Sequence, residues 1–212
     1  MGGSGPGRPA CKVTIVKLWT IQRPPAWDEL RTTGILRATA KHVNPDFEDA
    51  YAWMRAQMVT RIGPPPEPDG YPIWAWYRYA GEKKPRPDLR CGGHLCRGVR
   101  GVRIEIECAP ETALLSDFSE WHAVLSQRYI AASEAEADAF DDERLIANRV
   151  WHNSCASRPD FVARIRASWE RIFDIERYVE GLTSELEGRM IQACLCQVRM
   201  DQVRDVTPFV SR

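Results

Sequence analysis

Val102-Arg-Ile-Glu-Ile-Glu-Cys108 is the clearest secondary-structure signal in this chain of 212 residues. Apolar and charged residues alternate along it, as in an antiparallel strand with one face on a core and the other in water. Further strand-like stretches cover residues 12–21 and 71–79 on the N-terminal side, and 190–198 and 203–210 on the C-terminal side. With helical patterns between them, these stretches predict an α+β fold, a mixed or antiparallel sheet flanked by helices.

Apolar spacing predicts helices over residues 27–33, 46–62, 117–131 and 159–188. The last is the longest, and Pro159 and Gly188 stand at its two ends, where helices favour these residues. The first ten residues are mostly Gly, Pro and Ser. We therefore expect a flexible leader over residues 1–10 and one α+β domain over residues 11–212.

The composition narrows the class of protein. Hydrophobic residues make up 44% and charged residues 27% of the chain, which excludes full-length disorder and rod-like proteins. No apolar run reaches the roughly 18 residues that a membrane-spanning helix needs. The N-terminus has no apolar signal-peptide segment, so we expect a cytoplasmic protein with reduced thiols, and no membrane partner.

A net charge of zero conceals an asymmetry. Residues 1–106 hold 17 basic and 10 acidic side chains, while residues 107–212 hold 12 and 19. Most of the excess lies in the basic loop over residues 78–103, with eight basic and two acidic residues. This loop is either a contact for the phosphates of a dinucleotide or nucleic acid, or a solvated segment paired with the acidic half.

Cys91-Gly-Gly-His94-Leu-Cys96 combines two residue types that bind zinc. A structural zinc site needs four ligands, usually from two paired clusters with short spacers, and only one loose cluster is present. We therefore expect no metal site here.

Eight Trp is a high count, and five of them precede residue 80. In residues 71–79, strand geometry puts Trp74 and Trp76 on one face and Tyr77 on the other. Such rings either fill a core or line a pocket in which nicotinamide, adenine or a free base stacks. The chain has no G-x-G-x-x-G and no phosphate-binding P-loop motif.

Several blocks resemble a bacterial family of domains of unknown function. The opening Lys17-Leu-Trp-Thr-Ile-Gln22 is followed by Tyr71-Pro-Ile-Trp-Ala-Trp76, and Ser168-Trp-Glu-Arg-Ile-Phe-Asp174 lies near the end. Together with the shorter blocks between them, they extend the resemblance over roughly residues 17–210. The family name implies no activity.

The chain also resembles, more distantly, ADP-ribosyltransferase folds such as the DNA-modifying toxin DarT. The likeness lies in the opening strand with its polar end, and in a closing strand followed by V-x-x-V, here Val203-Arg-Asp-Val206. It implies cleavage of the nicotinamide–ribose bond of NAD, with a carboxylate on the closing strand. Gln192 stands in place of that carboxylate, and Glu105 or Glu107 could substitute for it.

This second resemblance implies an NAD-dependent transferase that modifies a nucleic acid, nucleotide or protein. In the implied site, the nicotinamide ribose is contacted by Trp19, Thr20 and Gln22, and the ring that stacks on the ligand is Trp76 or Tyr77. The pyrophosphate is bound by Arg90, and the ribose diol by Gln192. Gln192 and Thr20 would be the catalytic pair. The alternative is a non-catalytic module that binds a nucleotide or a partner, which the amide of Gln192 favours.

Overall fold

The computed structural model describes residues 14–151 and 158–212. The leader expected over residues 1–10 lies outside the described residues. Within the described part of the chain, no helix is long and apolar enough to cross a membrane.

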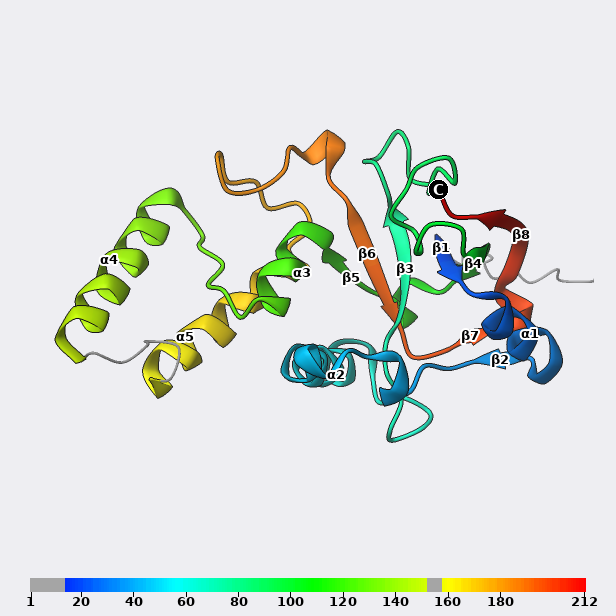
Figure 1. The fold of residues 1–212 in the computed structure, drawn as a ribbon, viewed down its shortest axis with the longest axis horizontal. Coiled ribbons are helices and arrows are strands. Elements are labelled where there is room, and N and C mark those ends of the chain that lie inside the picture. The colour runs from blue at the N-terminus through cyan, green and yellow to red at the C-terminus, as the bar shows by residue number, and fades with distance from the viewer. Residues whose placement is uncertain (1–13, 152–157) are drawn as a thin grey trace, which may run out of the picture.

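A six-stranded sheet forms the centre of the protein, in the order β5-β6-β3-β1-β4-β8 (Figure 1). All its neighbouring strands are antiparallel, and β2 and β7 form a separate antiparallel pair. The strands are β1 (Val16–Gln22), β2 (Ile35–Leu36), β3 (Ile73–Arg78), β4 (Arg100–Cys108), β5 (Leu114–Asp117), β6 (Ile191–Leu195), β7 (Val198–Arg199) and β8 (Val203–Val210). The predicted α+β class with an antiparallel sheet is confirmed.

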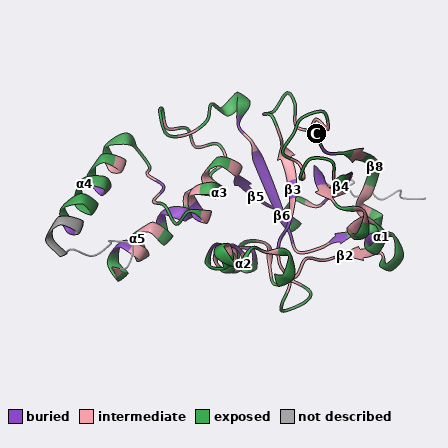
Figure 2. Cartoon of the chain, viewed as in Figure 1, coloured by how far each residue is buried: buried purple, intermediate pink, exposed green. Residues whose placement is uncertain are grey.

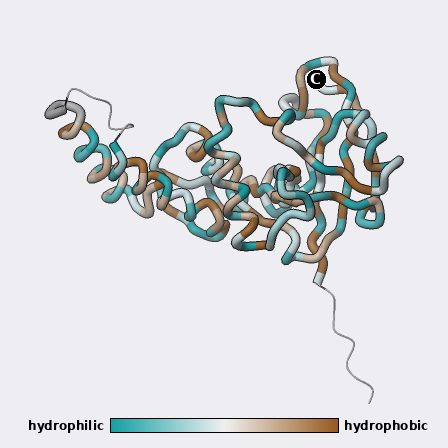
Figure 3. Tube along the Cα trace, turned by 90° about the horizontal axis from the view of Figure 1, so that it is seen from below, coloured by the Kyte–Doolittle hydropathy of each residue, from teal (hydrophilic) through white to brown (hydrophobic). Residues whose placement is uncertain are grey.

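Helices lie between the strands in sequence. They are α1 (Pro24–Thr33), α2 (Glu48–Ile62), α3 (Phe118–Leu125), α4 (Glu134–Trp151) and α5 (Pro159–Ser168). Helix α1 begins at Pro24, earlier than predicted, because a proline fits the first helical turn, where no backbone donor is needed. Helices α4 and α5 form an arm that extends away from the sheet (Figures 1 and 3).

Each face of the sheet belongs to a different hydrophobic core. On one face, Leu18 and Ile104 pack with Leu30 of α1. On the other face, Leu114 of β5 and Cys194 of β6 pack against α2, α3 and the 3₁₀ turn Trp169–Phe173. Figure 2 shows the central strands as the most buried part of the chain.

Helix α3 is shorter than predicted, ending at Leu125 and not near residue 131. Gln127 has a φ of 52°, the left-handed conformation that ends helices. The N–H of Arg128 then bonds back to the carbonyl of Ala123 at 2.8 Å, which closes the last turn.

The helix predicted over residues 159–188 is wrong beyond its first half. Helix α5 ends at Ser168 and continues as 3₁₀ turn to Phe173, and residues 174–190 are largely irregular. Ile172 of the predicted apolar stripe is buried, whereas Leu182 and Leu186 are exposed. The spacing of these leucines is helical by coincidence, because no core lies beneath them.

Strand β4 departs from the predicted half-exposed pattern at one position. Arg103, on the charged face, is only 8% exposed. Its guanidinium donates to the carbonyl of Pro87 at 2.9 Å and to the hydroxyl of Thr207 at 3.1 Å. The basic loop therefore covers part of this face.

Candidate functional site

One line of side chains crosses five strands on the same face of the sheet. The strand register pairs Trp19 with Trp76 and Glu105, and pairs Gln192 with Trp76 and Ser116. Residues that pair directly across neighbouring strands project to the same side. We call this line the transverse row, and in sheet order it consists of Ser116, Gln192, Trp76, Trp19 and Glu105.

Trp19 is fixed in the row by a carboxylate. Its indole N–H donates to Oε2 of Glu105 at 2.9 Å, and the ammonium of Lys17 lies 2.8 Å from the other oxygen. Partial burial raises the pKa of Glu105, but the bonds from Lys17 and Trp19 outweigh it and hold that pKa below its usual value. Glu105 is thus ionised at neutral pH, and its charge is already shared with Lys17.

Trp76 belongs to a chain of aromatic contacts. Its ring centroid lies 5.0 Å from those of Tyr79 and Phe118. Tyr79 in turn contacts His94, which lies 5.9 Å from Phe209 of β8. These contacts join the basic loop to the row, and Trp76 itself stays partly exposed.

Gln192 and Ser116 carry polar atoms with no partner. Gln192 is 9% exposed and Ser116 is fully buried. Within the described parts of the chain, neither Oε1 of Gln192 nor Oγ of Ser116 has a hydrogen-bond partner. Leaving a buried polar atom unsatisfied costs about 1–3 kcal/mol, so a hydrogen-bond donor brought to Gln192, the one of the two that keeps some exposure, would be stabilising.

The residues predicted for an NAD site divide between the two faces of the sheet. Trp19, Trp76 and Gln192 share the transverse row. Thr20 and Gln22 alternate with Trp19 and so face the opposite side, where Gln22 donates to the Thr20 hydroxyl at 2.7 Å. Thr20 itself is fully buried and donates to the carbonyl of Trp74 at 2.8 Å.

Tyr77 also packs on the opposite face, against the core that contains Leu18. Arg90 lies in the basic loop, away from the strands that form the row. It makes a two-bond ion pair with Asp88, and these bonds hold the pKa of Asp88 well below its usual value. The structure therefore brings together three of the seven predicted residues.

The Cys91–Cys96 stretch makes no metal cluster. Cys91 and Cys96 are exposed, and His94 Nε2 lies 2.8 Å from the backbone carbonyl of Asp88. Residues 14–151 and 158–212 contain no group of three or more His, Cys, Asp or Glu that could hold a metal ion. His94 serves the packing of the loop.

Ser116, which stands directly before the N-cap of α3, was not identified as a site residue from the sequence. The cap is Asp117, whose Oδ1 accepts from the backbone N–H of Glu120 at 3.0 Å. The signal that could have located Ser116 is its place in a short strand beside the closing strand. The register of β5 with β6 then pairs it with Gln192, and register between distant strands is not readable from one sequence.

Comparisons with known proteins agree with the first resemblance. No curated protein and no solved structure matches the chain. The sequence profile of the family described as "Domain of unknown function (DUF3841)" matches residues 17–204, which contain the whole transverse row. Since the match covers most of its length, the chain belongs to the DUF3841 family.

Proposed function

We propose that the transverse row binds a nucleotide, and that the protein is an NAD-dependent transferase of the ADP-ribosyltransferase type. Its target is a nucleic acid, a nucleotide or a protein. One observation carries this proposal: Trp19, Trp76 and Gln192, far apart in the sequence, lie in register on three neighbouring strands and on one face. A stacking ring and a hydroxyl ligand are the two things that a nicotinamide riboside needs from a protein.

The chemistry of the row fits that ligand in part. Oε1 of Gln192 can accept a hydrogen bond from a ribose hydroxyl, whereas Ser116 is fully buried and supports the row from within the sheet. Trp76, which packs against Phe118 at a tilt of 55°, offers a partly exposed indole in the same row. NAD supplies a nicotinamide–ribose bond whose cleavage develops positive charge on the ribose.

The row stabilises that developing positive charge only weakly. An amide cannot balance a cation as a carboxylate does, and Gln192 is uncharged. Glu105 is ionised but lies across β1 and β3 from Gln192, where Lys17 shares its charge. We therefore expect tight binding with slow turnover, and a role for Glu105 in orienting Trp19 through the indole N–H.

A matched pair of glutamine variants tests the proposal. Gln192→Ala removes an amide in the row, and Gln22→Ala removes one on the opposite face of the same sheet. Calorimetric titration of the purified protein with NAD⁺ and ADP-ribose should give a Kd about tenfold weaker for Gln192→Ala. Gln22→Ala should leave the Kd within about twofold. The reverse order, or no binding of either ligand to the unmodified protein, would refute a nucleotide site in the row.

Release of nicotinamide separates catalysis from binding. The unmodified protein should release nicotinamide from NAD⁺ only when its target is present, and Gln192→Ala should abolish the release. NAD⁺ binding without any release of nicotinamide in the presence of nucleic acid, nucleotide or protein extracts would exclude the transferase and favour a second, non-catalytic function.

That second function is a non-catalytic module that binds a nucleotide or a nucleic acid. Two observations favour it: the amide of Gln192, and basic side chains of the loop that make no ion pair with any described residue. Arg103 is one of these but is buried, and the exposed ones are Lys84, Arg86, Arg97 and Arg100. If all four contact phosphates of single-stranded nucleic acid, log Kd should change with log salt with a slope of about 3. A slope near zero would exclude this partner.

A further inference from the structure

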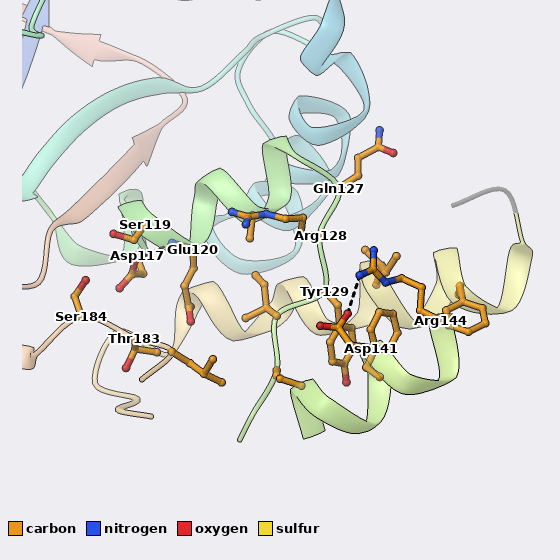
Figure 4. Close-up of a pocket in the computed structure, with 18 residues that line it drawn as sticks. Asp117, Ser119, Glu120, Gln127, Arg128, Tyr129, Asp141, Arg144, Thr183 and Ser184 are labelled. Atoms are coloured by element: carbon orange, nitrogen blue, oxygen red, sulfur yellow. Dashed lines mark hydrogen bonds and ion pairs between the residues drawn. The ribbon is translucent and has the colours of Figure 1, made fainter. Parts of the chain in front are cut away.

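A cavity of about 600 Å³ lies apart from the transverse row, where α3 meets the arm of α4 and α5 (Figure 4). Its walls come from the start of α3, the loop after α3, the inner faces of α4 and α5, and residues 182–184. This volume is within the range of small-molecule sites in proteins. Neither the row nor the proposed nucleotide chemistry uses it.

The wall formed by the loop after α3 is held rigidly. Side chains from the segment after α5 bond to its backbone: Trp169 donates to the carbonyl of Arg128 at 2.8 Å, and Arg177 donates to that of Ala131 at 3.0 Å. Ser168 accepts from the N–H of Ile130 at 2.9 Å. A site built on fixed backbone loses little entropy when a ligand binds.

The two ends of the cavity differ in chemistry. One end has hydrogen-bond acceptors, namely the carboxylates of Asp117 and Glu120 and the hydroxyls of Ser119 and Ser184. The other end has aromatic rings: Tyr129 stacks on Phe140 at 4.0 Å, and Phe140 contacts Phe161 at 5.5 Å. Asp141 and Arg144 line this end as well and pair with each other at 3.0 Å. A ligand that matches both ends has a donor-rich head and an apolar body.

Glu120 has one carboxylate oxygen that can accept a further hydrogen bond. Its Oε1 accepts from Arg177, and no described residue donates to its Oε2. Both carboxylate oxygens of Asp117 already have partners. Its Oδ1 accepts a hydrogen bond from the backbone N–H of Glu120, and its Oδ2 lies 3.4 Å from Nε of Arg189. A carboxylate can accept several hydrogen bonds, so Oε2 is available to a ligand in the cavity.

The charges around Glu120 favour a cationic head. Arg177 and Arg189 face Glu120 and Asp117, Asp174 adds a further negative charge from the irregular segment, and Arg128 lines the same cavity from the loop after α3. Burial raises the pKa of Glu120 to about 7, with Asp117 and Asp174 adding to the rise and the two arginines opposing it. Burial therefore disfavours the ionised form, and a cation bound beside Glu120 would stabilise that form.

We propose that this cavity binds a small primary amine with an aromatic or apolar body. The ammonium donates to Oε2 of Glu120, and the body packs on Tyr129, Phe140 and Phe161. This site is independent of the transverse row, so either proposal can fail without the other.

Tryptamine and indole-3-propionate test the proposal as a matched pair, because they share the ring and chain but carry opposite charges. Calorimetric titration of the full chain should show tryptamine binding at least about tenfold more tightly than indole-3-propionate. Tryptamine affinity should also rise from pH 6 to pH 8, as Glu120 ionises while the amine, like lysine with its pKa of about 10.4, stays protonated. Equal affinities for the two probes, or no tryptamine binding at millimolar concentration, would overturn the proposal.

Two kinds of variant locate the site. Glu120→Gln should weaken tryptamine binding at least about tenfold. Because that change leaves Arg177 without its charged partner, Ala137→Phe provides a second variant that fills the cavity without touching the charged cluster. Its control is Ala139→Phe, at an exposed position on α4 that does not line the cavity. Loss of binding in Ala137→Phe but not in Ala139→Phe or Gln192→Ala supports the proposal, and retained binding in Ala137→Phe refutes it.

Discussion

Replacing Arg189 by methionine removes a guanidinium that the fold has enclosed completely. Arg189 is 2% exposed, and its two terminal nitrogens donate to the carbonyls of Ile175 at 2.9 Å and Ser184 at 3.0 Å. Its Nε faces Asp117, which is equally buried. One side chain thus ties the irregular segment 174–190 to the end of β5.

We expect Arg189→Met to lower the free energy of unfolding by about 3–5 kcal/mol, because it leaves Asp117 as an unpaired buried charge. Asp117→Asn should cost less, since asparagine still caps α3. The double variant should then be less destabilised than the sum of the two, with a coupling energy of about 1–3 kcal/mol.

Urea denaturation followed by far-UV circular dichroism measures these values, with equal m-values as the test that the unfolding transition is unchanged. Arg31→Met is the matched control. Arg31 pairs with Asp28 at 3.1 Å but is 64% exposed, so its loss should cost less than about 1 kcal/mol. A cost for Arg189→Met no larger than that of the control, or no coupling with Asp117→Asn, would refute the reasoning.

Two further predictions concern the loop and the pH dependence. Gly81→Ala should lower the free energy of unfolding by about 1–3 kcal/mol, because φ is +80° there and a Cβ would lie 1.8 Å from the carbonyl oxygen of Glu187. Gly93→Ala is the control in the same urea assay. It should cost less, because Gly93 has a similar φ of +88° but open space around it. The pKa of Glu120, raised by burial from 4.5 to about 7, means that the folded protein keeps a proton that the unfolded chain releases between those values. The free energy of unfolding should therefore fall from pH 4.5 to pH 7 more steeply in the unmodified protein than in Glu120→Gln, and parallel curves would contradict this.

Local patterns predicted the regular elements well. The alternation of residues 102–108 and the β-branched and aromatic runs around Leu18 and Trp76 each became a strand, because in these segments side-chain period and burial agree. The helix over residues 46–62 is confirmed for the same reason, with Met54 and Met58 buried on one side. Where a pattern had no core beneath it, as at Leu182 and Leu186, the prediction was wrong.

The candidate site was less predictable, because it depends on register between strands far apart in the sequence. Neighbouring residues such as Trp19 and Thr20 were assigned to one site, yet the period of two in a strand puts them on opposite faces. Trp76 and Gln192 are 116 positions apart, and only the pairing of β3 with β6 brings them together. Glu120 was overlooked because its burial comes from Arg177 and the irregular segment, which have no sequence pattern of their own.

The position of β6 in the sheet has a consequence for how the chain can fold. Its five residues, 191–195, are all buried and lie between β3 and β5, which both precede them in the sequence. Until they are synthesised, β5 has no strand to join it to the sheet, and β3 presents an open edge with Trp74 and Trp76 on it. The last strand, β8, then covers the β4 edge. A nascent chain therefore carries two aggregation-prone strand edges until residues 191–210 have been synthesised. Closure of the sheet depends on contacts between residues far apart in the sequence, and such contacts form slowly.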